Sequence, residues 1–203
     1  MTSAPSKVKA AITIFKRHGG TLRTSEALRL GIHPRTLYIL RESGQIRQLS
    51  RGLYRLADLP PVSNPDLVIV ARRLPHAVIC LISALAFHEL TTQVPHVVDI
   101  ALPRGAERPS VDYPPLRVVW FSGPAWSEGV ETHALDGAPV HIYSAAKSIA
   151  DCFKYRNKTG LDVAIEALKF YRQRRDFDAN ALTKYARICR VERVMQPYLE
   201  AML

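Results

Sequence analysis

Arginine and lysine side chains concentrate in the first third of the sequence, where they could recognise phosphates and base edges. Residues 1–60 hold 11 Lys and Arg against 3 Asp and Glu, a net charge of +8, whereas residues 61–203 hold 17 against 15, a net charge of +2. A guanidinium group can donate two parallel hydrogen bonds to a phosphate or to a guanine edge. The uneven charge indicates that one module contacts a polyanion; an ordinary basic surface is the alternative.

A second set of residues has the form of a serine nucleophile site. Ser144 and Lys147 form an S-x-x-K pattern, and residues 158–160 read KTG, as in enzymes that recognise penicillin. The third element of that set, S-D-N, is absent between them, and the gap is too short to hold it. We therefore expect Ser144 to cap a helix, and Lys147 to pair with Asp151 one turn later for a few tenths of a kcal/mol.

The sequence contains no motif typical of a metal-binding or cofactor-binding site. The seven histidines lack metal-ligand spacing, and neither a G-x-G-x-x-G motif nor a P-loop is present. His133 and His141 flank the turn "DGA" and could be cross-strand neighbours, and a solvated or hydrogen-bonded pair is favoured there over a metal site. We predict no metal, no cofactor and no catalytic residue. A nucleic-acid enzyme would require acidic residues such as Asp99, Glu131 and Asp151 to meet in space.

The sequence also contains three cysteines, whose thiols could be reactive. Cys80, Cys152 and Cys189 lie far apart among apolar neighbours, which favours buried thiols over disulfides or a zinc site. The sequence has no uninterrupted apolar run of membrane-spanning length, and its start lacks the apolar core of a signal peptide. We expect a cytoplasmic protein with no membrane partner.

The basic residues of the first module need elements that present them, and "TSEALRLGIHPRTLYILRESGQIRQLSRGLYRL" provides these. A short helix from a Thr24 cap to Leu30, a turn at Gly31, and a second helix from Pro34 to Ser43 form a helix-turn-helix. A preceding helix spans residues 6–18, with Val8, Ala11, Ile12 and Phe15 at helical spacing. "QIRQL" and "GLYRL" alternate as strands around "SRG", which predicts a wing.

Helical geometry determines which side chains of the second helix face outward. At about 100° per residue, Leu37 and Leu40 face the core, whereas Arg35, Tyr38, Ile39 and Glu42 point away. Base-reading residues usually lie near the start of such a helix, and a wing tip reaches a phosphate or the minor groove. The predicted DNA-binding residues are Ser25, Arg29, Arg35, Thr36, Tyr38, Arg41, Arg47, Arg51 and Arg55.

The clearest boundary is "LPPVSNP", residues 59–65, where prolines interrupt helix and strand and the charge balance changes. We predict two domains, residues 1–60 and residues 61–203. In the second, "AVICLI", "VVDIAL", "RVVWFS", "VETHAL" and "PVHIY" have strand composition, Ser83 is expected to cap a helix, and helices follow Tyr143. Trp120 and Trp126 are expected in the core. The fold class is α+β: a winged helix-turn-helix followed by a mixed domain with a helical C-terminal half.

Several motifs together resemble one known family. The wing pattern appears as Gly44, Ile46, Arg51, Gly52 and Tyr54; "SALAFHEL" and "SAAKSIADCFKYR" follow in the same order. In that order, and over almost the whole chain, the sequence is similar to AbiEi-type antitoxins of bacterial toxin–antitoxin pairs. The winged-helix part of this resemblance is shared by many regulators, whereas the order of both halves is far more specific.

The resemblance implies a function without catalysis. It implies an N-terminal domain that binds inverted repeats in its own promoter and represses it, and a C-terminal domain that counteracts a neighbouring nucleotidyltransferase-like toxin. For the segment around Ser144, a toxin-handling surface is an alternative to the structural role of capping a helix. The alternatives are a winged helix used for protein contact, and a winged-helix transcription factor whose C-terminal domain senses a ligand or acts as a scaffold.

Overall fold

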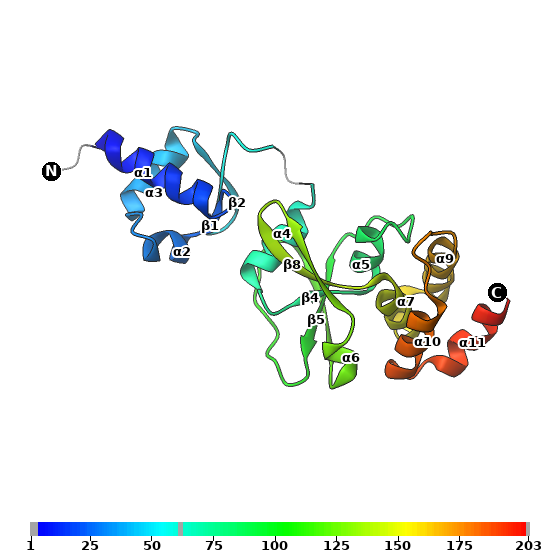
Figure 1. Ribbon diagram of the computed structural model, residues 1–203. Helices are drawn as coiled ribbons and strands as arrows, with labels where there is room; N and C mark the ends of the chain where they lie inside the picture. Colours follow the sequence, from blue (N-terminus) through cyan, green and yellow to red (C-terminus); the bar gives the residue numbers. More distant parts are fainter. Residues whose placement is uncertain (1–3, 61–62, 202–203) are drawn as a thin grey trace. The chain divides into compact units, whose positions relative to one another are not determined.

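The computed structural model describes residues 4–60 and 63–201, and the chain divides into two compact units (Figure 1). The N-terminal unit comprises Met1–Arg73 with Ala134–Val140, and the C-terminal unit comprises Leu74–His133 with His141–Leu203. The architecture is α+β, as predicted: a winged helix-turn-helix, then mixed strands and helices, then helices alone. Among the described residues, no helix has the length and apolar character needed to cross a bilayer.

The N-terminal unit contains a three-stranded antiparallel sheet with the strand order β1-β3-β2. Its elements are α1 (Ala4–Arg17), β1 (Thr21–Arg23), α2 (Thr24–Arg29), α3 (Pro34–Glu42), β2 (Ile46–Ser50), β3 (Leu53–Leu56) and α4 (Pro65–Arg73). The predicted helices and wing strands are confirmed. Strand β1 was not predicted, because three residues are too few to show alternation and the strand exists only by pairing with β3.

The ends of the two helix-turn-helix segments follow the local sequence closely. Helix α2 is capped by Arg23 rather than by Thr24, because the Glu26 carboxylate accepts a hydrogen bond of 2.9 Å from the Arg23 backbone N–H. Gly31 closes the helix at φ 85°, a conformation that favours glycine. Pro34 begins α3, and the His33 Nδ1 accepts from the Arg35 N–H at 3.1 Å.

One apolar cluster holds this winged helix together. Phe15 of α1, Leu22 of β1 and Leu40 of α3 are almost fully buried in it. The other buried members are Ala11, Ala27, Ile32, Leu37, Ile46 and Leu56. Since α1, α3 and the wing all contribute, the orientation of α3 is fixed by packing from three sides.

The second part of the chain contains a five-stranded mixed sheet with the strand order β6-β5-β4-β8-β7. Strand β5 pairs parallel with β6 and antiparallel with β4, which pairs parallel with β8. The elements are β4 (Val78–Ile79), α5 (Leu81–Phe87), β5 (Val98–Pro103), β6 (Leu116–Phe121), α6 (Pro124–Ser127), β7 (Val130–Leu135), β8 (Ala138–Tyr143), α7 (Ala145–Lys154), α8 (Arg156–Thr159), α9 (Leu161–Arg172), α10 (Ala179–Ile188) and α11 (Glu192–Glu200). The short helices α6 and α8 were not predicted from the sequence.

The prediction for "AVICLI" is wrong in its second half. The strand ends after Ile79, and α5 begins at Leu81 with Cys80 as its N-cap residue, so Ser83 lies within the helix. The Asp99 carboxylate, from the neighbouring strand β5, accepts from the Ser83 N–H at 3.3 Å, and the Ser83 hydroxyl accepts from the Asp99 N–H at 2.8 Å. A contact distant in sequence therefore caps this helix, and local composition does not show it.

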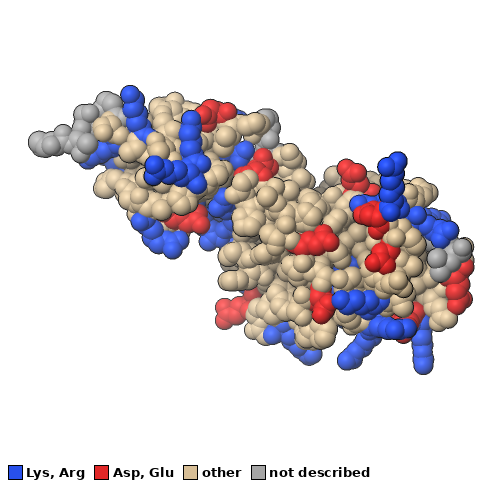
Figure 2. All heavy atoms as spheres, in the orientation of Figure 1, with Lys and Arg blue, Asp and Glu red and all other residues tan. Residues whose placement is uncertain are grey.

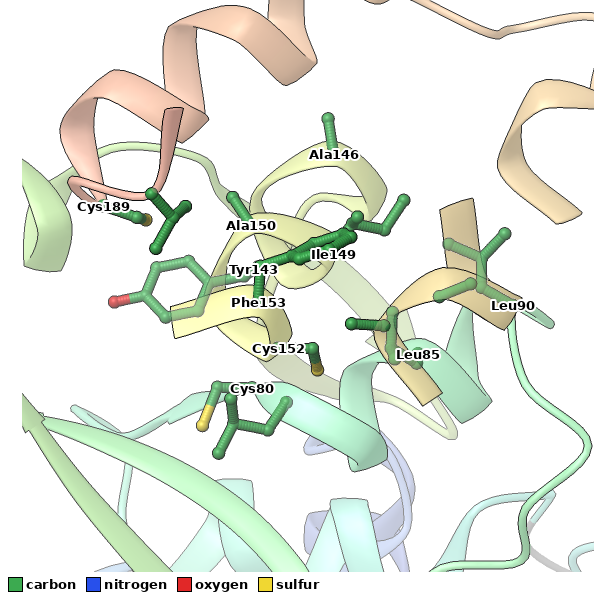
Figure 3. Packing of buried hydrophobic residues seen from close by; sticks show 14 of the residues in the cluster. Cys80, Leu85, Leu90, Tyr143, Ala146, Ile149, Ala150, Cys152, Phe153 and Cys189 are labelled. Carbon is green, nitrogen blue, oxygen red and sulfur yellow. The ribbon is translucent and has the colours of Figure 1, made fainter. Parts of the chain in front are cut away.

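The C-terminal unit is built around α7, whose side chains lie among those of β4, α5, α9 and α10 (Figure 3). Tyr143 and Phe153 are buried in this cluster. The cysteines Cys80, Cys152 and Cys189 are free and buried, as predicted, and burial raises the pKa of each thiol, to about 12 for Cys189. These thiols contribute to packing and are protonated at neutral pH.

An ion pair inside this core corrects the expectation for Lys147 and Asp151. Both side chains are fully buried, and the Lys147 Nζ lies 2.8 and 2.6 Å from the two carboxylate oxygens. The Cys189 thiol donates to the same carboxylate at 3.2 Å, and the Tyr143 ring lies 4.1 Å from the ammonium. Burial raises the pKa of the Asp151 carboxyl, and Lys147 opposes that shift. The pair is thus buried, and the expected stabilisation of a few tenths of a kcal/mol, which applies to an exposed pair, underestimates the effect of breaking it.

We predict that breaking this pair destabilises the C-terminal unit. Asp151→Asn leaves a buried ammonium without its counter-charge and should lower the free energy of unfolding by about 3–5 kcal/mol. The double variant Lys147→Met/Asp151→Leu should recover most of that loss. Urea denaturation measures both effects, with Lys169→Met, at an exposed position of α9, as the control. A double variant as unstable as Asp151→Asn would contradict this account.

Candidate nucleic-acid interface

Helix α3 presents one apolar face to the core and one exposed face to solvent. Leu37 and Leu40 are buried, whereas Tyr38 is 56% and Ile39 37% exposed. Arg35 is also exposed, at the first turn of the helix. Large exposed apolar side chains beside a cation are suited to a DNA groove, where they contact thymine methyl groups while the guanidinium binds a guanine. The predicted division of α3 is therefore confirmed for these residues.

Two of the predicted DNA-binding residues do not lie on the surface. Thr36 is 7% exposed because its position on α3 turns toward the core. Arg55 is 6% exposed, and its guanidinium donates to the Thr21 hydroxyl and to the Pro60 carbonyl, both at 3.2 Å. It also pairs with Asp136 at 3.5 Å within the same unit. The expectation that Thr36 and Arg55 face DNA is wrong, because these side chains are committed to the interior.

Glu42 is an acidic residue on the otherwise basic exposed surface of α3, and Arg41 is its partner. The Arg41 guanidinium donates to the Glu42 carboxylate at 3.1 Å and lies 5.2 Å from the centre of the Tyr38 ring. The hydrogen bond to Glu42 raises the pKa of Arg41. Glu42 therefore has a cationic partner on the same helix, and the pair keeps Arg41 over Tyr38.

The wing is joined to α2 by its turn. The backbone N–H and the hydroxyl of Thr24 both donate to the Gly52 carbonyl, at 2.9 and 3.3 Å. Gly52 has φ +70°, and a Cβ there would stand 3.4 Å from the Thr24 hydroxyl. The glycine therefore meets a conformational need, and the two hydrogen bonds from Thr24 place the wing beside the helix-turn-helix.

Sequence reasoning missed Arg73, which supports the wing tip from α4. Its guanidinium donates to the Arg51 carbonyl and, at 3.4 Å, to the Ser50 hydroxyl. The only local signal was the pair Arg72 and Arg73, which lies in the last turn of α4, where cations are normally favoured by the helix dipole. Arg73 thus positions Arg51, whose own side chain remains exposed.

The other predicted DNA-binding residues of this surface are exposed. Ser25 and Arg29 are exposed on α2, and Arg47 is exposed on β2, where its guanidinium donates to the Ala57 carbonyl at 2.7 Å. Figure 2 shows Lys and Arg atoms gathered over the N-terminal module on the face in view, with fewer Asp and Glu atoms among them. The module therefore combines a protruding helix, a wing and exposed cations.

The histidine prediction in the C-terminal unit is wrong. His141 hydrogen bonds to the Thr132 hydroxyl at 3.0 Å, and His133 pairs with Glu131 at 3.1 Å, so the two rings are not cross-strand neighbours. Trp120 is 39% exposed, which also departs from the expectation of core packing, whereas Trp126 packs against the core.

Each of the acidic residues considered for catalysis lies against a basic partner. Asp99 pairs with Arg117, Glu131 with His133, and Asp151 with Lys147. Within residues 4–60 and 63–201, no group of three His, Cys, Asp or Glu is placed to hold a metal ion. Each carboxylate thus has a partner that accounts for its position.

Comparison with solved structures shows the fold. The crystal structure of the RV2827C protein from Mycobacterium tuberculosis matches with a TM-score of 0.59 and 13% sequence identity, over 90% of this chain and 72% of that chain. No curated protein matches the sequence.

The family comparison concerns the module that carries the helix-turn-helix and wing. Residues 9–57 match the model of a family described as "Transcriptional regulator, AbiEi antitoxin". The matched range contains α2, α3 and the wing, together with most of α1. Over residues 9–57, this chain is therefore similar to the AbiEi antitoxin family of transcriptional regulators.

Proposed function

We propose that this protein is the antitoxin of a bacterial toxin–antitoxin pair, and that it binds and represses its own promoter. Residues 1–60 form the DNA-binding domain in this proposal, and residues 61–203 form the domain that counteracts a nucleotidyltransferase-like toxin encoded nearby. The observation that carries the proposal is the match of residues 9–57 to AbiEi regulators, on a module whose recognition helix exposes Arg35, Tyr38 and Ile39.

The proposed DNA complex follows from the exposed residues of this module. Helix α3 enters the major groove, where Arg35 donates to a guanine, and Tyr38 and Ile39 contact thymine methyl groups or sugars. Arg51 at the wing tip reaches a phosphate or the minor groove. The positioning contacts to the DNA backbone come from Ser25, Arg29, Arg41 and Arg47.

Inverted repeats in the promoter would place two copies of the protein on one operator. A twofold arrangement of half-sites mirrors a pair of identical proteins, and half-site centres one helical turn apart, about 34 Å, place both on one face of the duplex. The second copy can be present beforehand or can arrive on the DNA, and both routes give one protein per half-site.

A second candidate function is a winged-helix transcription factor whose C-terminal domain senses a ligand. A cavity of about 710 Å³ within the C-terminal unit favours it. The neighbouring gene distinguishes the two candidates, because a nucleotidyltransferase-like toxin beside this gene supports the antitoxin.

Substitutions at the recognition helix and the wing should weaken DNA binding in two different ways. Arg35→Ala should lower the affinity for the preferred DNA sequence by about tenfold, since a bidentate contact to a base contributes roughly 1–3 kcal/mol. It should also reduce the discrimination between bases at one position of the operator. Arg51→Ala should lower the affinity for all DNA sequences alike. It should also reduce the slope of log affinity against log salt concentration by about 1. Fluorescence anisotropy with promoter DNA at several salt concentrations measures both.

The control for these variants is Arg172→Ala, which removes an exposed arginine from α9 in the C-terminal unit. It should leave the affinity unchanged. If Arg35→Ala and Arg51→Ala also left it unchanged, neither residue would belong to the interface.

Arg55 should behave as an interior residue. Arg55→Ala should lower the free energy of unfolding by about 2 kcal/mol, because it removes hydrogen bonds from a buried charged group. Arg47→Ala is the matched control, since Arg47 is the exposed cross-strand partner of Arg55. Thermal denaturation of both variants, without DNA, makes the comparison. Equal stability of the two variants would contradict the interior role.

The antitoxin role predicts that DNA binding and neutralisation are separable. In cells that express the neighbouring toxin, the full-length Arg35→Ala/Arg51→Ala variant should restore growth as well as the parent chain while failing to repress a promoter reporter. Residues 61–203 expressed alone should also restore growth. Loss of rescue by the stably folded double variant would argue against a separate antitoxin domain.

A further inference from the structure

The C-terminal unit contains a hollow of about 710 Å³ that the proposed antitoxin function does not use. It lies where the end of β6 and helix α6 meet the end of α7 and the turn between α10 and α11; Figure 1 shows α6 near α10. Its lining residues are Arg104, Trp120, Phe121, Ser122, Pro124, Ala125, Lys154, Tyr155, Ile188 and Arg190. The volume is in the range of pockets that hold small organic ligands, about 300–1,000 Å³.

The charges around this hollow all have one sign. Arg104, Lys154 and Arg190 are exposed, and no Asp or Glu is among the lining residues. The ion pairs and side-chain hydrogen bonds within the described part of the chain include none of these three cations. Cations gathered at a concave surface without a counter-charge concentrate the field there and attract an anion.

Aromatic rings provide the second half of the chemistry. Trp120 is 39% exposed, and its indole N–H donates to the Ala106 carbonyl at 2.9 Å, which fixes one edge of the ring. Phe121 and Tyr155 meet edge to face with ring centres 5.8 Å apart, and the Lys154 ammonium lies 5.6 Å from the Phe121 ring. A base or another flat ring can stack on such side chains.

Arg190 occupies a position where helices usually have glycine. It follows the last turn of α10 at φ 59°, with its N–H bonded to the Arg187 carbonyl and the Val191 N–H to the Ala186 carbonyl. This pair of bonds is the Schellman arrangement, in which the left-handed residue is most often glycine. An arginine in this strained position brings a guanidinium to the hollow, and strain of this kind accumulates at ligand sites.

We propose that this hollow, which we call the anion pocket, binds a nucleoside phosphate. The phosphates lie among Arg104, Lys154 and Arg190, which donate charge-assisted hydrogen bonds, and the base stacks on the exposed ring of Trp120 beside the half-buried ring of Tyr155. The inference is independent of the DNA-binding role, because all residues of the pocket lie in the C-terminal unit.

Titration calorimetry on the full-length chain tests the anion pocket with ATP, GTP, adenosine and tripolyphosphate as probes. A nucleoside triphosphate should bind, and adenosine and tripolyphosphate should each bind at least tenfold more weakly. Tripolyphosphate that binds as tightly as ATP would overturn the role of the aromatic rings. No heat with either triphosphate at millimolar concentration would overturn the proposal altogether.

The sharpest variant is Arg190→Gly, because glycine relieves the backbone strain while removing the cation, so the fold should be retained. Arg190→Gly and Arg104→Ala should each weaken nucleotide binding at least tenfold, whereas Lys169→Ala, which removes an exposed lysine from α9, should not. Arg35→Ala/Arg51→Ala should also bind nucleotide normally. If that double variant lost the binding and Arg190→Gly kept it, the nucleotide would occupy the DNA surface and the anion pocket would be excluded.

Discussion

The buried contacts of Leu37 and Leu40 beneath α3 determine what the rest of the N-terminal module can do. These two side chains are fixed against the cluster formed by α1 and the wing, and this packing also fixes which side of α3 faces solvent. Arg35, Tyr38 and Ile39 are held outward by packing that they do not themselves make. The apolar core therefore determines which side chains lie on the surface. A loss of packing would misplace the exposed residues of α3 that are proposed to recognise DNA.

The arginines of this module show that charge alone does not assign a role. Arg35 and Arg51 are exposed, Arg55 is satisfied in the interior, and Arg73 supports the wing backbone. All four are equivalent in a count of net charge. They differ in the acceptors around them, and a guanidinium surrounded by carbonyl and hydroxyl oxygens has little capacity left for a phosphate.

Local sequence signals predicted much of this fold, since glycine turns, Pro34 and apolar periodicity act within a few residues. They gave the winged helix, the hairpin of β7 and β8, and the helices after Tyr143. The failures involve partners that local patterns do not show: Asp99 caps α5, and His141 bonds to Thr132 rather than lying against His133. The anion pocket could not be predicted for the same reason, because its cations come from segments up to 86 positions apart, at Arg104 and Arg190.

The hydrogen bonds that Arg73 and Thr24 make to the wing turn have a consequence for the speed and cost of association. A wing whose backbone carbonyls are already engaged has few alternative shapes to lose on contact with a duplex, so the entropic penalty of ordering is met during folding. In the proposed DNA complex, such a rigid wing would meet the duplex already in its bound shape and would not have to rearrange after the first contact.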